Sequence, residues 1–144
     1  MRVELTSLGS RLYAHCSALG KVLLAYRPEA DVKGIVKTEG LPRFTPHIIT
    51  DEDELEQALA KIRKQGYAYD LEEILPDLCC VGAPIHDYTG HVITAISMSI
   101  PAYRFQRSQT EFRKAIMRTA KMVSEPLGYY GAQAGSIPSR RIGP

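Results

Sequence analysis

The sequence predicts an α+β fold in which helices flank an antiparallel β-sheet, within one domain of 144 residues. Three observations predict this fold. Apolar residues recur at helical spacing in the first half of the chain and again near its end, residues between them alternate with strand spacing, and a tight turn joins two of the strands. Helices and strands segregated along the chain in this way are typical of the α+β class.

The first two helices are predicted before residue 40. The first covers residues 17–26, where Ser17 is a suitable N-cap. Its apolar stripe, at three- and four-residue spacing, is expected to consist of Leu19, Val22, Leu23 and Tyr26. The second helix covers residues 28–37, with Pro28 at its start, acidic residues in its first turn and Gly40 after its end.

A loop and a third helix follow. Residues 41–49 contain two prolines and are expected to form an extended loop. Thr50 is the expected N-cap of the third helix, and Gly66 is its expected stop. The buried face of this helix is expected to consist of Leu55, Ala58, Leu59 and Ile62.

The sheet is predicted from residues 67–71, 79–86 and 91–100. Asp87 and Gly90 bound a type I turn between the last two strands, since Asp is preferred at the first position of such a turn and Gly at the last. One face of the last strand is expected to carry Val92, Thr94, Ile96, Met98 and Ile100. The other face is expected to carry His91, Ile93, Ala95, Ser97 and Ser99.

A last helix is predicted over residues 108–127, where Pro126 and Gly128 end it. Its inner stripe is expected to consist of Phe112, Ala115, Ile116, Thr119, Ala120 and Val123. Three strands make a thin sheet for four helices. Either short strands near residues 3–5 and 12–14 complete the sheet, or part of the domain lies upstream of Met1.

Composition narrows the range of functions. The 18 basic and 16 acidic residues give a net charge of +2, a balance too weak to indicate nucleic-acid binding. The sequence has no apolar run of membrane-spanning length and no secretory signal, so no membrane partner is expected. The three cysteines, two of them adjacent, do not suggest a disulfide framework and fit the reducing cytoplasm. Phosphate-binding loops, metalloprotease motifs and nucleophile elbows are absent from the sequence.

A set of polar residues suggests a ligand pocket. Asp70 ends one predicted strand, Cys80 begins another, and Ser97 and Ser99 share one face of the third. The helix that starts at Ser17 offers free backbone N–H groups, which together with the helix dipole form an anion site. Hydroxyls, a thiol and a carboxyl near that site would orient a small polar ligand. The same residues have ordinary explanations as solvent-facing serines, a core cysteine and a strand-end acid.

An enzyme with a catalytic cysteine is the main chemical alternative. Cys16 beside His15, or Cys80 with His86 or His91, would pair a nucleophile with a base. Adjacent residues do not face each other on a helix or strand, and Cys80 and His86 lie far apart along an extended chain. A zinc site from His15, Cys16 and Cys80 lacks diagnostic spacing. No catalytic residue, metal or cofactor is therefore expected, and the chain is not predicted to be an enzyme.

Ordered sequence blocks carry a family resemblance. They are GSRLYAHCSALGKVLLA at residues 9–25, LPRFTPHIITD at 41–51, IRKQGYAYDLEE at 62–73, CVGAPI at 80–85 and AISMS at 95–99. The match covers about residues 7–128. On these blocks the chain resembles the effector-binding domain of the isocitrate-lyase regulator (IclR) family of bacterial transcription regulators.

The resemblance implies a fold similar to GAF and profilin-like sensor domains. It implies a pocket for a small organic acid effector (a keto acid, sugar acid or aromatic acid) and assembly into homodimers or homotetramers in the cytoplasm. In complete family members a winged helix-turn-helix precedes this domain and binds operator DNA, and the effector modulates that binding. Operator DNA is therefore expected as a partner only through a domain that is missing from this chain.

The resemblance also assigns ligand-binding residues. They are Ala18, Leu19, Asp70, Leu78, Cys80, Ser97 and Ser99. The first two would offer backbone N–H groups at the helix start to the ligand carboxylate. The acid and the thiol would contact the other end of the ligand, the serines would hydrogen-bond it from the sheet, and Leu78 would form an apolar wall. Closure of the loop at residues 41–50 would bury the ligand.

The expected organisation is an effector-binding domain over residues 1–130 and a mobile tail over residues 131–144, which is rich in Gly, Ser, Pro and Arg. Compared with complete family members, the domain is expected to lack its N-terminal strands as well as the winged helix-turn-helix. Two alternative functions stay open, namely an oligomerisation module that binds no ligand and a cysteine-dependent enzyme.

Overall fold

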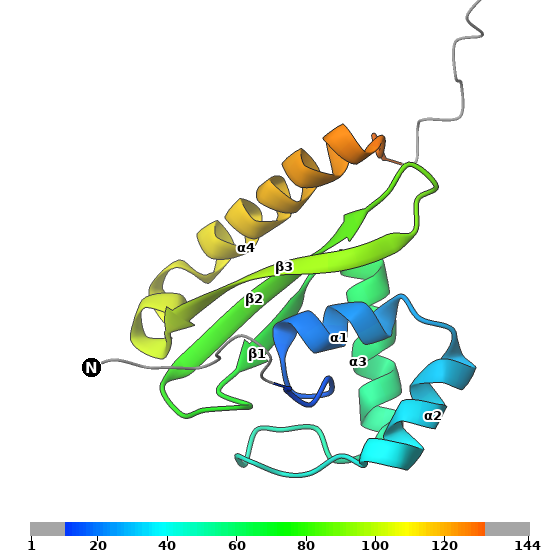
Figure 1. Cartoon of the computed structure of the whole chain (residues 1–144). Coiled ribbons are helices and arrows are strands. Elements are labelled where there is room, and N and C mark those ends of the chain that lie inside the picture. Colours follow the sequence, from blue (N-terminus) through cyan, green and yellow to red (C-terminus); the bar gives the residue numbers. More distant parts are fainter. Residues whose placement is uncertain (1–10, 132–144) are drawn as a thin grey trace, which may run out of the picture.

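A three-stranded antiparallel sheet is the centre of the computed structural model, which describes residues 11–131. The elements in chain order are α1 (Ala18–Ala25), α2 (Glu29–Glu39), α3 (Glu52–Gln65), β1 (Ala68–Leu71), β2 (Leu78–His86), β3 (Val92–Pro101), α4 (Ala102–Ser124) and the 3₁₀ helix η1 (Glu125–Leu127). The strand order is β1-β2-β3 (Figure 1). The predicted α+β class, with helices flanking an antiparallel sheet, is confirmed.

Three predicted features lie at the ends of the chain. The strand expected near residues 3–5 and the tail beyond Gly131 lie outside the described residues. The strand expected at residues 12–14 is wrong, because this segment has no regular structure before it turns into α1. None of the helices within residues 11–131 is long and apolar enough to cross a lipid bilayer.

Helices cover the two faces of the sheet with separate hydrophobic cores (Figure 1). α4 covers one face, and the core on that side consists of Cys79, Val81, Ala83, Ile85, Ile100, Ala102, Phe105, Ile116 and Ala120. The core on the α1 side consists of Val22, Leu24, Ala25, Val36, Leu55, Leu59, Ile62 and Ala68. Because side chains alternate along a strand, the odd-numbered residues of β2 face α4 and the even-numbered residues face α1.

α1 begins as predicted, but its buried surface differs from the prediction. The Ser17 hydroxyl accepts a hydrogen bond from the Gly20 N–H at 2.9 Å, which confirms Ser17 as the N-cap. Leu19 and Leu23 were expected to be buried, yet they are 39% and 38% exposed. The reason is that α1 packs against the sheet and against α3 together, so it buries two sides with Ala18, Val22, Leu24 and other residues instead of one stripe.

α3 is capped one residue later than predicted. Asp51, not Thr50, is the N-cap, since its carboxylate accepts the Glu54 N–H at 2.9 Å. Leu55, Leu59 and Ile62 are buried as expected, while Ala58 is only partly buried. Gly66 ends the helix in the left-handed conformation with φ of 81°, which glycine adopts without strain.

α4 starts six residues earlier than the predicted helix, because residues 102–107 continue it across a kink. The kink lies at Ser108, whose φ of −139° and ψ of 32° are not helical. Thr119 and Val123 are exposed, contrary to the predicted inner stripe, and Ser124 is buried instead. The Ser124 hydroxyl accepts the His86 N–H at 3.0 Å and donates to the Ala120 carbonyl at 2.8 Å, so it holds the end of α4 against the end of β2.

The close approach at Gly20 predicts a large loss of stability in Gly20→Ala. An added Cβ would lie 2.4 Å from the Ala14 Cα and carbonyl oxygen, and these backbone atoms have no rotamer to adjust. We expect a decrease in the free energy of unfolding of about 1–3 kcal/mol or more. Urea denaturation followed by circular dichroism measures it.

Gly34→Ala is the matched control, because Gly34 lies exposed within α2 and an added Cβ would meet nothing within 4 Å. In that variant we expect a gain of about 0.5–1 kcal/mol from helix propensity. Equal effects of the two substitutions would contradict the packing described at Gly20.

Candidate ligand-binding site

The start of α1 rests directly on the middle of the sheet. At Gly82 of β2 an added Cβ would lie 3.3 Å from the backbone carbon and oxygen of Ala18, so a side chain there would require the start of α1 to move by a few tenths of an ångström. Ser17 satisfies the N–H groups of Gly20 and Lys21 with its hydroxyl and its carbonyl. The N–H groups of Ala18 and Leu19 also belong to the first turn of α1, where backbone donors have no partner within the helix.

The strand register brings the predicted sheet residues together on the face that carries α1. Asp70 of β1 is paired with Cys80 of β2, which is paired with Ser99 of β3. Ser97 is paired with Gly82, directly below the start of α1. Leu78 lies two residues before Cys80 on the same face. Asp70, Cys80 and Ser99 thus form a polar row across all three strands, with Ser97 beside it.

The polar row runs from a buried end to an open end. Asp70 is 1% exposed, and its Oδ1 accepts the Glu73 N–H at 2.8 Å. Burial raises the pKa of Asp70 above its usual value, while hydrogen bonds from the backbone of Glu73 and Ile74 oppose this shift. The Cys80 Sγ lies 3.2 Å from the Ser99 hydroxyl, which is at the exposed edge of the sheet.

An ion pair that the sequence analysis missed lies next to this row. Lys21 of α1 donates to Glu73 Oε1 at 2.5 Å, and the two residues are 5% and 7% exposed. Glu73 lies in the loop after β1, and its backbone carbonyl accepts the Thr45 hydroxyl at 3.0 Å. The signal in the sequence was a single charged residue within the otherwise apolar helix ALGKVLLA. A lysine in such a helix needs a buried acid.

The cysteine-dependent enzyme gains no support from the geometry. Burial raises the pKa of Cys16 to about 11 and also raises that of Cys80, so both thiols stay protonated and weakly nucleophilic. His15 binds the Pro42 carbonyl through Nε2 at 3.1 Å. His86 stacks on Tyr129 with ring centroids 4.3 Å apart. Cys80 and His86 are six residues apart on one strand, or about 20 Å.

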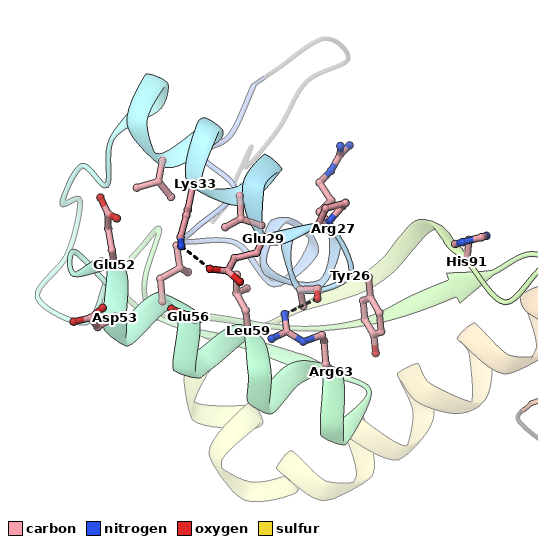
Figure 2. A pocket seen from close by; sticks show the side chains of 15 residues that line it. Tyr26, Arg27, Glu29, Lys33, Glu52, Asp53, Glu56, Leu59, Arg63 and His91 are labelled. Atoms are coloured by element: carbon pink, nitrogen blue, oxygen red, sulfur yellow. Dashed lines mark hydrogen bonds and ion pairs between the residues drawn. The ribbon is translucent and has the colours of Figure 1, made fainter.

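A groove with a volume of about 600 Å³ lies elsewhere, between α2 and α3. Figure 2 shows Leu59 on one wall and the Glu29–Lys33 pair at the rim. Its acidic residues include Glu29 and Glu52, which lie in the first turns of α2 and α3 and complement the helix dipoles. The charged side chains that line the groove are largely exposed to solvent. Buried polar groups converge instead at the α1 start, which makes that face the better candidate site.

No group of three or more His, Cys, Asp or Glu side chains within residues 11–131 is arranged to hold a metal ion.

The fold and the sequence place the chain among the C-terminal domains of bacterial transcription regulators. A family model described as "Bacterial transcriptional regulator IclR C-terminal" matches residues 2–125. The chain therefore belongs to the IclR family.

Comparisons with individual proteins agree with this family assignment. The HTH-type transcriptional repressor AllR of Salmonella typhi is 42% identical over 122 residues, which are 84% of this chain and 45% of AllR. The solved C-terminal domain of the Escherichia coli regulator KdgR has a TM-score of 0.77 and 35% identity, covering 84% of this chain and 74% of that domain chain. These relatives are named as regulators, not as enzymes, in agreement with the prediction.

A third neighbour is the inducer-binding domain of the PobR transcription factor from Acinetobacter, solved as a double mutant in complex with 3-hydroxybenzoic acid. It has a TM-score of 0.74 and 26% identity, covering 83% of this chain and 69% of that chain. The chain spans about half the length of the curated relatives that it matches.

The Lys21–Glu73 pair predicts non-additive effects on stability. Lys21→Met removes the cation and leaves the Glu73 carboxylate buried without its partner, so we expect a loss of about 3–5 kcal/mol in the free energy of unfolding. The double variant Lys21→Met with Glu73→Leu removes both charges and should recover much of that loss. Urea denaturation of the single and double variants measures the coupling.

Lys33→Met is the control for this cycle, because the Lys33–Glu29 pair has both side chains 66% exposed. We expect a much smaller change in the free energy of unfolding there, because water screens an exposed pair. Similar effects of Lys21→Met and Lys33→Met would show that the buried pair contributes no more than a surface pair.

Proposed function

We propose that this chain is a ligand-sensing domain that binds a small organic acid at the start of α1. The ligand carboxylate would accept hydrogen bonds from the N–H groups of Ala18 and Leu19, where the helix dipole favours an anion. The observation that carries this proposal is the contact of that helix start with Gly82, which is paired with Ser97, beside the polar row of Asp70, Cys80 and Ser99.

The remaining parts of the ligand would meet the sheet. Ser97, Ser99 and Cys80 offer two hydroxyls and a thiol, and Leu78 offers an apolar wall next to them. Donors and acceptors at fixed spacing above an apolar wall suit a keto, sugar or aromatic acid. The PobR domain solved with 3-hydroxybenzoic acid supports an acid of this kind, because it shares the fold.

In this proposal the loop at residues 41–50 closes over the ligand. It is linked to the site region by two contacts, from Thr45 to the Glu73 carbonyl and from the Pro42 carbonyl to His15. A ligand that binds the closed arrangement more tightly than the open one would shift the population between them. Coupling of this type typically amounts to about 1–3 kcal/mol.

In this proposal the chain acts as part of a longer cytoplasmic regulator. The effector-binding domain extends to about residue 130 and assembles into homodimers or homotetramers. A winged helix-turn-helix outside this chain binds operator DNA, and the acid modulates that binding. The names of the matched relatives, which are HTH-type regulators, support this assignment.

A thermal shift screen tests the ligand assignment. Glyoxylate, pyruvate and 3-hydroxybenzoate are added in turn to the 144-residue chain. An acid at one hundred times its Kd stabilises the folded state by about 2.7 kcal/mol, which raises Tm by roughly 5 °C or more. We expect at least one acid to do so, and we expect the Ser97→Ala, Ser99→Ala double variant to lose the shift.

Thr110→Ala is the matched control, since it removes a hydroxyl from the exposed face of α4. It should leave the ligand-induced shift unchanged. Self-association without a Tm shift by any acid would favour an oligomerisation module instead. Turnover that disappears in Cys80→Ala would favour an enzyme.

A further inference from the structure

The candidate site contains a buried cluster of charges that is not balanced. Lys21, Asp70 and Glu73 are 5%, 1% and 7% exposed. Lys21 donates to Glu73 Oε1 at 2.5 Å, and the Glu73 N–H donates to Asp70 Oδ1 at 2.8 Å. With both acids ionised, the cluster holds one positive and two negative charges. A buried excess of charge is costly because little water reaches it.

The two carboxylates differ in how well their ionised forms are stabilised. Asp70 accepts hydrogen bonds from the backbone at Glu73 and Ile74, which favour the charged form. Glu73 uses Oε1 to bind Lys21, while its Oε2 is buried and has no hydrogen-bond partner among the described residues. Oε2 of Glu73 is therefore the oxygen at which a proton is best accommodated. Burial also raises the pKa of Glu73, against the effect of Lys21.

The other groups around Glu73 carry no charge at neutral pH. His15 and Cys16 precede α1, and Cys80 lies on β2. Burial lowers the pKa of His15 and raises the pKa of both thiols, so all three groups are neutral. The loop at residues 41–50 contributes the uncharged Thr45 hydroxyl, bound to the Glu73 carbonyl. The charges that act on Glu73 are those of Lys21 and Asp70.

Building on the proposed function, we infer that binding of an organic acid anion at the start of α1 is accompanied by uptake of one proton at Glu73 Oε2. The ligand carboxylate would bring a third negative charge to a cluster with one ammonium group. A proton on Oε2 removes one of these charges and leaves Lys21 bound to Oε1. The coupling needs no contact between ligand and Glu73, because charges in a protein interior interact over several ångströms.

Proton uptake sets the direction of the pH dependence. Above the pKa of Glu73 in the free protein and below its pKa in the complex, Kd should rise by about tenfold per pH unit. Below the first value Glu73 is protonated in both states, and above the second it is ionised in both. Affinity is therefore constant outside this window. The regulator would respond to its acid more strongly as the pH falls through the window.

Calorimetry of the whole 144-residue chain tests the proposal. Glyoxylate, pyruvate and 3-hydroxybenzoate are titrated at one neutral pH in imidazole and in Tris, two buffers without an anionic group whose ionisation enthalpies differ. Uptake of about one proton per ligand makes the observed heat differ between the buffers by that difference in ionisation enthalpy. Carbon NMR of the Glu73 carboxyl, with and without the acid that binds, locates the proton in the unmodified protein.

The Glu73→Gln variant tests whether the proton is taken up at Glu73 or at another group. Glutamine keeps an oxygen that accepts from Lys21 but takes up no proton, so the buffer difference and the pH dependence should both be lost. Glu111→Gln makes the same charge change on the exposed face of α4 and should keep both.

Three different results would overturn the inference. Equal heats in the two buffers, or proton uptake that persists in Glu73→Gln, would refute it while the proposed ligand site stands. Failure of every acid to bind would refute the proposed function, and this inference with it.

Discussion

The contact between the start of α1 and the middle of β2 is the constraint on which the rest of the site depends. Gly82 has no side chain, and an added Cβ would lie only 3.3 Å from the Ala18 backbone. This approach sets the height of α1 above the sheet and buries Lys21 beside the loop after β1. It also places the helix start over the paired residues Gly82 and Ser97, next to the pair Cys80 and Ser99. A helix raised by one side chain would separate these groups.

Much of the fold could be predicted from periodicity and capping chemistry. Helix caps and turns depend on only a few neighbouring residues, and most of the predicted ones are found where expected: Ser17, Gly40, Gly66 and the Asp87–Gly90 turn. The predictions were wrong where tertiary packing determines which residues are buried or where a helix begins. α1 is covered on two sides, so a one-sided stripe misplaced Leu19 and Leu23. The start of α4 before the Ser108 kink was missed because the helical pattern is interrupted there.

The candidate site was predictable in part, for a physical reason. Residues two apart on a strand share a face, so Ser97 and Ser99 could be grouped from the sequence, and the register then adds Asp70 and Cys80. The Lys21–Glu73 pair could not be found in this way. A charged residue on a helix is placed in water by default, and its partner lies 52 positions later in the chain. Sequence spacing carries no information about such a distance.

Gly20 and Gly82 have a consequence for how such a domain changes its specificity. Both allow α1 to lie close to its neighbours because they have no side chain, so they position the helix start proposed to bind the acid without contributing a group that recognises the rest of a ligand. Recognition is left to the side chains of the sheet, which are anchored separately by the strand ladder. For a domain with the proposed function, replacing one or two of those side chains would exchange one acid for another while the backbone scaffold stays the same. The close backbone contacts at Gly20 and Gly82 must therefore stay constant, whereas the side chains on the sheet are free to change.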